Sequence, residues 1–275
     1  MSGRTLAGKA LLYGALVLAG VATVAPLAWM VSASFMPRGQ ANTYPPSFLP
    51  HGATLANYRE LFTRLNLGRN FVNSLLLAVA VTLVSLLLNS MAGYAFAKLR
   101  FGGRRRLFGL LLAALVIPPQ VGMLPLFLLL RSLSLINSYW GVVLPAMASI
   151  YGIFLVRQYA LSIPDELLDA ARIDGAGELR IYWSVVLPLC KPILVSLAIF
   201  TFLASWNDFT WPLVVLTDNS MYTLPIALAN LMGEHTQDTE LMMAGSVLTV
   251  LPVLLVFIVL QRYYIAGIML GSVKE

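Results

Sequence analysis

The chain has 275 residues, 59% of them hydrophobic and 11% charged, with a formal net charge of +6. Soluble domains carry roughly 25% charged residues, so this composition is unlike theirs and indicates an integral membrane protein. The single cysteine, Cys190, excludes an internal disulfide and a cysteine-cluster metal site.

Six stretches are long and apolar enough to cross a bilayer, which takes about 20 residues of helix. Five of them, at residues 10–37, 70–97, 107–130, 132–156 and 241–261, contain no charged residue, and the sixth, at 192–217, contains only Asp208. An isolated strand cannot satisfy its backbone hydrogen bonds in lipid, so all six are expected to be helices. The sequence therefore predicts an all-α integral membrane protein with six transmembrane helices.

The first stretch also has features of a signal peptide. Arg4 and Lys9 precede it, and the tripeptide Val31-Ser32-Ala33 resembles a cleavage site. However, its apolar run is longer than the roughly 7–15 residues of an ordinary signal core. This length favours a span that the mature protein retains.

The 18 Lys and Arg residues divide unevenly between alternate loops. If the N-terminus is cytoplasmic, 13 of the 18 lie on the cytoplasmic side, and the outer side holds the other five, Arg38, Arg59, Arg64, Arg69 and Arg131. Cytoplasmic loops carry the excess of positive charge, which predicts that both termini are cytoplasmic. The net charge then reflects membrane topology and gives no reason to expect a nucleic-acid partner.

Two loops between the spans have a distinct composition. The outer loop after the first span is rich in Pro, Asn and aromatic residues, which predicts an extended segment and then a short amphipathic helix at about 55–64. The composition of this outer loop is equally compatible with a solvated connector and with a docking surface for another protein. The inner loop 98–106, KLRFGGRRR, gathers five cations around two glycines, which is typical of a turn held against anionic headgroups.

Prolines interrupt the third and fifth stretches beside polar residues. Pro118, Pro119 and Pro212 cannot donate backbone hydrogen bonds, so each leaves a carbonyl group of the preceding turn free. A broken helix with polar side chains is tolerated at membrane depth only where it is buried in protein or faces a wet cavity. The alternative is that Asp208 lies near the outer headgroups. The candidate substrate-pathway residues are Gln120, Trp206, Asn207 and Asp208.

Several familiar catalytic signals are incomplete. Residues 3–9, GRTLAGK, match the spacing of a phosphate-binding loop, but Ala10 replaces the Ser or Thr that would hold magnesium, and no strand precedes them. His51 and His235 lie in separate loops without ligand spacing, and nothing resembles a nucleophile elbow. We therefore expect no ATP site, metal site or catalytic residue in this chain.

Residues 163–187 are unusually charged for a segment between two spans. Ser162 is expected to cap a helix that begins at Pro164, and its acidic first turn suits the positive end of the helix dipole. Gly175 is expected to end that helix in the left-handed conformation, and a second helix to begin near Glu178. Such an elbow suits a groove on another protein. The alternative, a helix pair lying under an anionic leaflet, fits poorly with five acidic residues.

The stretch DAARIDGAGELRIYWSVVLP resembles the Glu-Ala-Ala loop of permease subunits in ATP-binding-cassette importers. Asp replaces Glu and Val replaces Ile, which keeps charge and shape. The resemblance implies that this segment is a coupling helix held in the cleft of an ATPase. The implied coupling residues are Asp169, Ala170, Ala171, Arg172, Asp174, Gly175, Leu187 and Pro188.

Three further stretches, IPPQVGMLPLFLLL, ASWNDFTWPL and QRYYIAGIMLGSVKE, are similar to the carbohydrate branch of these permeases, the maltose-permease type. The resemblance implies the type I importer fold of the smaller, six-span subunit. It divides the chain into an N-terminal helix and outer loop (1–68), a permease domain (69–265, coupling loop 158–190) and a cytoplasmic tail (266–275). It also implies a second permease, two ATPase subunits that carry ATP and magnesium, and an extracytoplasmic binding protein, in a bacterial or archaeal cytoplasmic membrane.

The expected function is therefore transport of a sugar, with ATP hydrolysis on partner subunits and no cofactor in this chain. An importer of the same class for glycerol-3-phosphate stays open, although a phosphate would favour an arginine within a span and none is present. Two other classes also stay open. A stand-alone secondary transporter would need an internal repeat or several carboxylates within the bilayer, and a membrane enzyme would act on its substrate without an ATPase.

Overall fold

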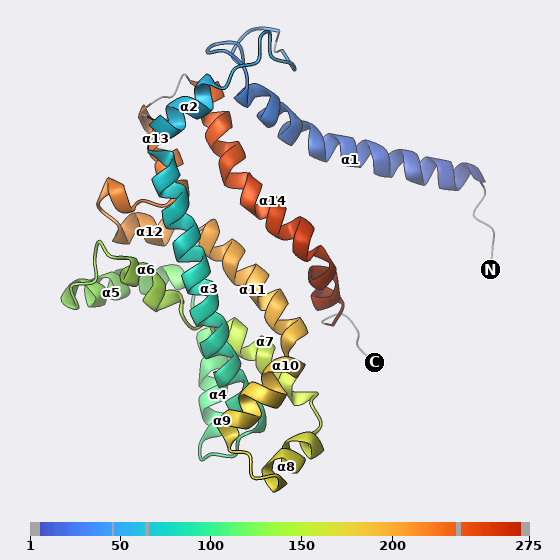
Figure 1. Cartoon of the computed structure of the whole chain (residues 1–275), viewed down its shortest axis with the longest axis vertical. Coiled ribbons are helices and arrows are strands. Elements are labelled where there is room, and N and C mark those ends of the chain that lie inside the picture. The colour runs from blue at the N-terminus through green and yellow to red at the C-terminus, as the bar shows by residue number, and fades with distance from the viewer. Residues whose placement is uncertain (1–5, 46, 64–65, 235–237, 271–275) are drawn as a thin grey trace. The chain divides into compact units, whose positions relative to one another are not determined.

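The computed structural model describes residues 6–45, 47–63, 66–234 and 238–270, and this part of the chain is helical without a strand (Figure 1). The described residues form two compact units. The smaller unit comprises Met1–Gly68 and Ala227–Pro252, and the larger unit comprises Arg69–Ile226 and Val253–Glu275. The all-α prediction is confirmed.

The helices of the smaller unit are α1 (Leu6–Ser34), α2 (Ala56–Thr63), most of α13 (Leu224–Glu234) and the first part of α14 (Thr239–Leu270). The larger unit contains nearly all of α3 (Leu67–Lys98), followed by α4 (Arg104–Ala114), α5 (Pro119–Ser132), α6 (Tyr139–Ala146), α7 (Ile150–Leu161), α8 (Asp165–Ile173), α9 (Glu178–Ile181), the π-helix η1 (Tyr182–Val186), α10 (Leu187–Leu189), α11 (Lys191–Trp206), α12 (Thr210–Val215) and the 3-10 helix η2 (Asn219–Met221).

Among the described residues, three helices are long and apolar enough to span a membrane unbroken: α1, α3 and α14. Three bent pairs pass the same test together. These are α4 with α5, bent by 103°, α6 with α7, bent by 41°, and the segment Glu178–Leu189 with α11, bent by 79°. With each bent pair counted as one span, the described residues have six candidate spans, the number that the sequence predicts. The fifth differs in its bounds, because the sequence placed it at 192–217 whereas the bent pair begins at Glu178 and ends at Trp206.

The break in the third span is confirmed, and proline explains it. Helix α4 ends at Ala114, and α5 begins at Pro119 after Pro118, whose backbone is extended (φ −59°, ψ 132°). Pro118 and Pro119 offer no N–H group to the preceding turn, and proline disfavours helical backbone in the residue before it. The chain therefore changes direction at this point.

The predicted boundaries of the fourth span are wrong. The sequence placed it at 132–156, but α6 begins at Tyr139 and α7 runs on to Leu161. Asn137 adopts left-handed backbone (φ 56°), and its N–H donates to the carbonyl group of Val215 at 2.8 Å. Asparagine tolerates this conformation better than most residues, so a turn forms where a helix was expected.

Two cores position the larger unit's helices. One gathers Leu77, Val81, Leu130, Val142 and Val215 from α3, α5, α6 and α12. The other packs the end of α3 against the coupling segment and is made of Tyr94, Ala97, Ala160, Ile163, Leu168, Ile181, Tyr182, Val186, Cys190 and Ile193. The second core therefore holds the charged segment 163–187 against the last turns of α3.

The smaller unit is held by buried polar contacts. Asn57 of α2 donates its side-chain amide to the carbonyl groups of Ser34 (3.0 Å) and Met36 (2.9 Å). The Glu240 carboxylate accepts the N–H of Ala41 at 2.7 Å. Helix α2 confirms the short helix predicted at about 55–64, although residues 64–65 lie outside the described residues.

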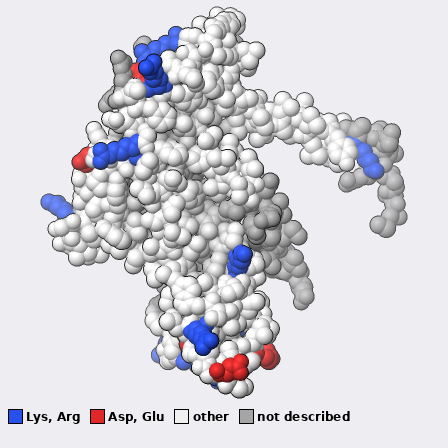
Figure 2. Space-filling model, in the orientation of Figure 1, with Lys and Arg blue, Asp and Glu red and all other residues white. Residues whose placement is uncertain are grey.

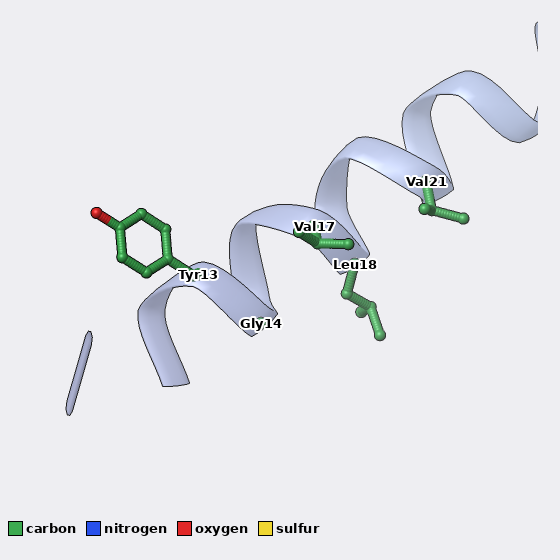
Figure 3. A pocket seen from close by; sticks show the side chains of 5 residues that line it. All are labelled: Tyr13, Gly14, Val17, Leu18 and Val21. Carbon is green, nitrogen blue, oxygen red and sulfur yellow. The ribbon is translucent and has the colours of Figure 1, made fainter. Parts of the chain in front are cut away.

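Helix α1 carries a shallow apolar depression of about 460 Å³ (Figure 3). The five residues that line it, Tyr13, Gly14, Val17, Leu18 and Val21, all come from this one helix, and only Tyr13 has a polar side-chain atom. A depression without charged or convergent polar groups suits an apolar neighbour such as lipid and is not a candidate substrate site.

Candidate coupling segment and cavity

Helix α8 ends in the turn that the sequence predicted. Gly175 has φ +79°, its N–H donates to the carbonyl group of Arg172 at 3.0 Å, and the N–H of Ala176 donates to that of Ala171 at 2.9 Å. This pair of hydrogen bonds closes the helix end in a Schellman motif, which needs a left-handed residue where Gly175 lies. The chain then turns into α9, so the helix–glycine–helix elbow is confirmed.

The start of α8 differs from the prediction. Ser162 does not cap α8: it ends α7, where its hydroxyl group donates to the carbonyl group of Tyr159 at 2.7 Å. Pro164 lies at the cap position with extended backbone (φ −58°, ψ 134°), and no side chain caps α8 there. Proline disfavours helical backbone at Ile163, so the helix begins only at Asp165.

Ion pairs connect the helices of the elbow to each other and to α3. Arg172 contacts Asp169 of its own helix at 2.8 Å and Glu178 of α9 at 2.9 Å, so one guanidinium group bridges α8 and α9. Lys98 of α3 pairs with Asp165 at 2.6 Å, and this hydrogen bond with the Lys98 ammonium lowers the pKa of the Asp165 carboxyl group below its usual value. Figure 2 shows acidic and basic side chains gathered at the end of the larger unit that carries α8.

The outer surface of the elbow combines small, charged and apolar side chains. Asp169, Ala170, Asp174 and Gly175 are exposed, and Ala171 is partly buried against the core. Ile173 is 86% exposed, which is unusual for so large an apolar side chain next to a charged turn. Ile173 was not among the predicted coupling residues, although its position five residues after the buried Leu168 places it on a different face of α8. Exposed apolar groups among charges are typical of a protein-docking surface.

The last two predicted coupling residues lie away from the elbow. Leu187 and Pro188 belong to α10, after the π-helix η1, where Leu187 packs on the core and Pro188 is exposed. The N–H of Leu187 donates to the carbonyl group of Tyr182, five residues earlier. Pro188 has no N–H with which to continue the α-helical hydrogen bonds. The structure thus brings Asp169–Gly175 together and places Leu187 and Pro188 at the entry to α11.

A cavity of about 390 Å³ lies among the helices of the larger unit. Helices α3, α6, α7, α11 and α12 contribute to it, and its wall mixes apolar, aromatic and polar side chains. Among its lining residues there is no Lys or Arg, and Asp208 is the one charged residue. Its polar and aromatic lining residues are Ser85, Ser149, Tyr151, Phe200, Thr201, Ser205, Asp208 and Trp211.

Of the four predicted pathway residues, the structure places only Asp208 in this cavity. Gln120 is exposed on α5, and Asn207 is exposed and donates its side-chain amide to the carbonyl group of Leu203 at 2.8 Å. Trp206 is 1% exposed and packs edge-on against Phe71 with 5.4 Å between ring centroids. Gln120, Trp206 and Asn207 therefore do not line the cavity.

Three aromatic residues, Tyr151, Phe200 and Trp211, line the cavity with Asp208 and were not among the predicted pathway residues. Trp211 donates its ring N–H to the carbonyl group of Gly141 at 3.1 Å, and its backbone N–H contacts the Asp208 carboxylate at 3.3 Å. Tyr151 comes from α7. Trp211 lies close to Asp208 in sequence, which was an available signal, whereas no local pattern points to Tyr151. The cavity offers hydroxyl groups, one carboxylate and aromatic faces, which suits a neutral, hydroxyl-rich molecule.

The amino-acid sequence is also similar to those of known transport proteins. Residues 89–269 match the family described as the inner membrane component of binding-protein-dependent transport systems. An arabinooligosaccharide transport system permease protein of Halalkalibacterium halodurans is 44% identical over 254 residues, covering 91% of each chain. An sn-glycerol-3-phosphate transport system permease protein of Yersinia pestis is 37% identical over 204 residues, covering 73% of this chain and 72% of that one.

One solved structure is closely similar in fold. It belongs to a bacterial ABC transporter involved in the import of the acidic polysaccharide alginate. The TM-score is 0.84 at 25% sequence identity, and the match covers 96% of this chain and 99% of the other.

Proposed function

The chain belongs to the family of inner membrane components of binding-protein-dependent transport systems, and from this premise we propose that it is the permease subunit of an ATP-driven importer for a neutral oligosaccharide. It is a bacterial membrane protein with six candidate spans. The observation that carries the proposal is the exposed elbow Asp169–Gly175, with Ala170 and Ile173 on its surface and Gly175 in left-handed backbone.

The elbow is suited to dock in an ATPase. Small side chains at Ala170 and Ala171 allow close approach of another protein's backbone, and exposed charges at Asp169 and Asp174 can fix the register. Two ATPase copies, a second permease and an extracytoplasmic binding protein complete the proposed assembly. ATP-driven closure of the ATPases would displace the elbow and switch access to the cavity, with the driving energy coming from contacts that differ between the two states.

The cavity supports a sugar as the substrate. Hydroxyl groups of a sugar match Asp208 and the serine and threonine hydroxyls, and its apolar ring face matches Trp211 and Tyr151. The relative with an arabinooligosaccharide name covers 91% of this chain, against 73% for the glycerol-3-phosphate relative. Both observations favour the sugar.

Glycerol-3-phosphate is the second candidate, because one relative carries that name. A phosphate group favours a bidentate or point-charge cation, and the cavity wall holds neither Arg nor Lys. A second permease would have to supply the cation. A phosphate substrate therefore requires a cation from the partner subunit, whereas a sugar substrate does not.

The test begins with affinity purification of the tagged chain in mild detergent and counting of its subunits by mass spectrometry. We expect one second permease and two ATPase copies. The complex is then reconstituted in liposomes with its binding protein, and ATP-dependent uptake of a labelled arabinose oligosaccharide is compared with that of glycerol-3-phosphate. Uptake of the phosphate alone would reject the sugar, and transport by the isolated chain without ATP would reject the importer.

A further inference from the structure

Three side chains of α3 at four-residue spacing reach the coupling segment. Ser90, Tyr94 and Lys98 lie on one face of the helix because α-helical positions four residues apart stack above one another. Ser90 is 2% exposed, Tyr94 is 3% exposed, and the side chain of Lys98 is 6% exposed. These three residues are called the α3 ladder below.

Each rung of the α3 ladder contacts a different part of the segment. The Ser90 and Tyr182 hydroxyl groups are 2.7 Å apart, which ties α3 to η1. The Tyr94 hydroxyl donates to the Glu178 carboxylate at 2.5 Å, which ties α3 to α9. The Lys98 ammonium donates to Asp165 and to the carbonyl group of Ile163, each at 2.6 Å, which ties α3 to the start of α8.

Hydrogen bonds also link α8 to α9 within the elbow. Glu178 accepts both from Tyr94 and from Arg172, and Arg172 in turn holds Asp169. A hydrogen-bond chain thus runs from α3 through α9 to the exposed face of α8. Beneath it, the buried side chains of Leu168 and Ile181 pack in the same core as Tyr94.

The other end of this stretch of α3 reaches the cavity. Ser85 and Val81 line it, and the Asn89 side-chain oxygen accepts the N–H of Ser149 at 2.9 Å, at the break between α6 and α7. Ser85 and Lys98 are 13 positions apart, which corresponds to about 20 Å along a helix. One rigid helix therefore touches both the coupling segment and the cavity.

We infer that Ser90, Tyr94 and Lys98 are positioning residues that make α3 and the coupling segment move as one body, so that α3 carries the displacement of the elbow to the cavity. Sliding of the segment along α3 would break all three rungs together and leave buried polar groups unpaired, which is costly. The inference rests on the proposed function, because it needs an ATPase that moves α8.

The test measures sugar imported per ATP hydrolysed in the reconstituted complex. Tyr94→Phe removes only a hydroxyl group, and Lys98→Met removes only the charge of a similarly long side chain. We expect each to lower the import ratio by roughly fivefold, the factor that one net hydrogen bond represents. The variant with Ser90→Ala, Tyr94→Phe and Lys98→Met is expected to hydrolyse ATP with almost no import.

Matched controls separate a loss of coupling from a loss of folding. Tyr159→Phe removes the side-chain hydroxyl of a partly buried tyrosine packed against the same core, and this hydroxyl has no hydrogen-bond partner among the described residues. Arg105→Met removes the charge of an exposed arginine on α4, outside the coupling segment, that has no ion pair among the described residues. Both are expected to keep the wild-type ratio. The exchange Lys98→Glu with Asp165→Lys restores the ion pair and is expected to recover part of the import that Lys98→Glu loses.

A distance measurement keeps the inference testable if a variant fails to assemble. Spin labels are placed at the exposed Met91 of α3 and Leu179 of α9, with the buried Cys190 replaced by Ala. We expect the same distance in the nucleotide-free and ATP-bound complexes. A change of about 5 Å, one helical turn, would overturn the inference, as would wild-type coupling in the triple variant. Failure of the unmodified complex to assemble or transport would instead overturn the proposed function.

Discussion

At the residue scale, Gly175 is the position in the elbow where the backbone conformation most strongly requires glycine. Its φ of +79° is one that a residue with a Cβ atom adopts only with strain, whereas Gly177, two residues later, has an ordinary φ of −72°. At both positions a Cβ atom would have no neighbouring atom within 4 Å, so the difference between them lies in the backbone and not in crowding.

This difference predicts the effect of two matched substitutions. Gly175→Ala is expected to destabilise the end of α8 by about 1 kcal/mol and to lower ATP-driven uptake severalfold, because the elbow no longer keeps its turn. Gly177→Ala is the control and should leave uptake unchanged. Uptake is measured in liposomes at equal amounts of inserted protein. Equal losses in the two variants would mean that the left-handed turn is not what matters.

Asp208 gives a second prediction, because it is the one charged residue on the cavity wall. Asp208→Asn keeps an acceptor for the N–H of Trp211 but removes the charge, and we expect roughly tenfold weaker sugar uptake from the loss of a charged hydrogen bond. Asp218→Asn, at an exposed position outside the cavity, is the control. If both variants transport equally, the cavity is not the sugar's route.

The Lys98–Asp165 pair predicts a pH dependence. Its hydrogen bond lowers the pKa of Asp165 from the ordinary value of 3.8, so the pair stabilises the folded protein above that value and is lost as the pH falls through the lower, folded pKa. The difference in melting temperature between wild type and Asp165→Asn should therefore be constant from pH 5 to 8 and shrink only below about pH 4. A difference that vanishes near neutral pH would show that the pair does not form.

At the element scale, glycine sets how closely α3 approaches α7. A Cβ atom at Gly93 would lie 2.7 Å from the side chain of Val156 and 3.0 Å from the backbone nitrogen of Arg157. The two helices therefore meet with no room for even one methyl group, which is how small residues let membrane helices pack.

Gly93→Ala should consequently destabilise the protein by about 1–3 kcal/mol, as overpacking does. Gly109→Ala is the matched control, since it places the same methyl group on α4, where nothing lies within 4 Å. Thermal melting of the purified complexes gives the comparison. A melting temperature for Gly93→Ala that equals that of Gly109→Ala would contradict the close α3–α7 contact.

At the scale of the whole molecule, the orientation in the membrane stays a prediction from charge alone. The excess of Lys and Arg on alternate loops predicts cytoplasmic termini. A fluorescent protein fused after Glu275 should therefore fold and fluoresce, and an alkaline phosphatase fused at the same point should be inactive. The reverse result would invert the topology and place the elbow outside, where no ATPase could bind it. Residues 271–275 of the predicted tail lie outside the described residues.

The sequence by itself determined the features that depend on neighbouring residues. Apolar runs predict spans because crossing lipid requires a continuous hydrophobic helix, and Gly175 predicts a helix end because only glycine adopts left-handed backbone without strain. Prolines at 118 and 119 likewise predict the break between α4 and α5. The exceptions, Ser162 and the turn at Asn137, arose where a local preference competed with proline or with a distant backbone contact.

Only the tertiary structure decided which distant residues meet. The rungs of the α3 ladder join residues 67, 84 and 92 positions apart, and the cavity gathers Ser85 of α3, Tyr151 of α7 and Asp208 of the connection between α11 and α12. Hydropathy and local propensity give the approximate position of each span but not its exact bounds, its rotation or its neighbours. Those depend on packing and on pairing of buried polar groups across the whole unit, which is why Trp206 proved to be core and Trp211 to line the cavity.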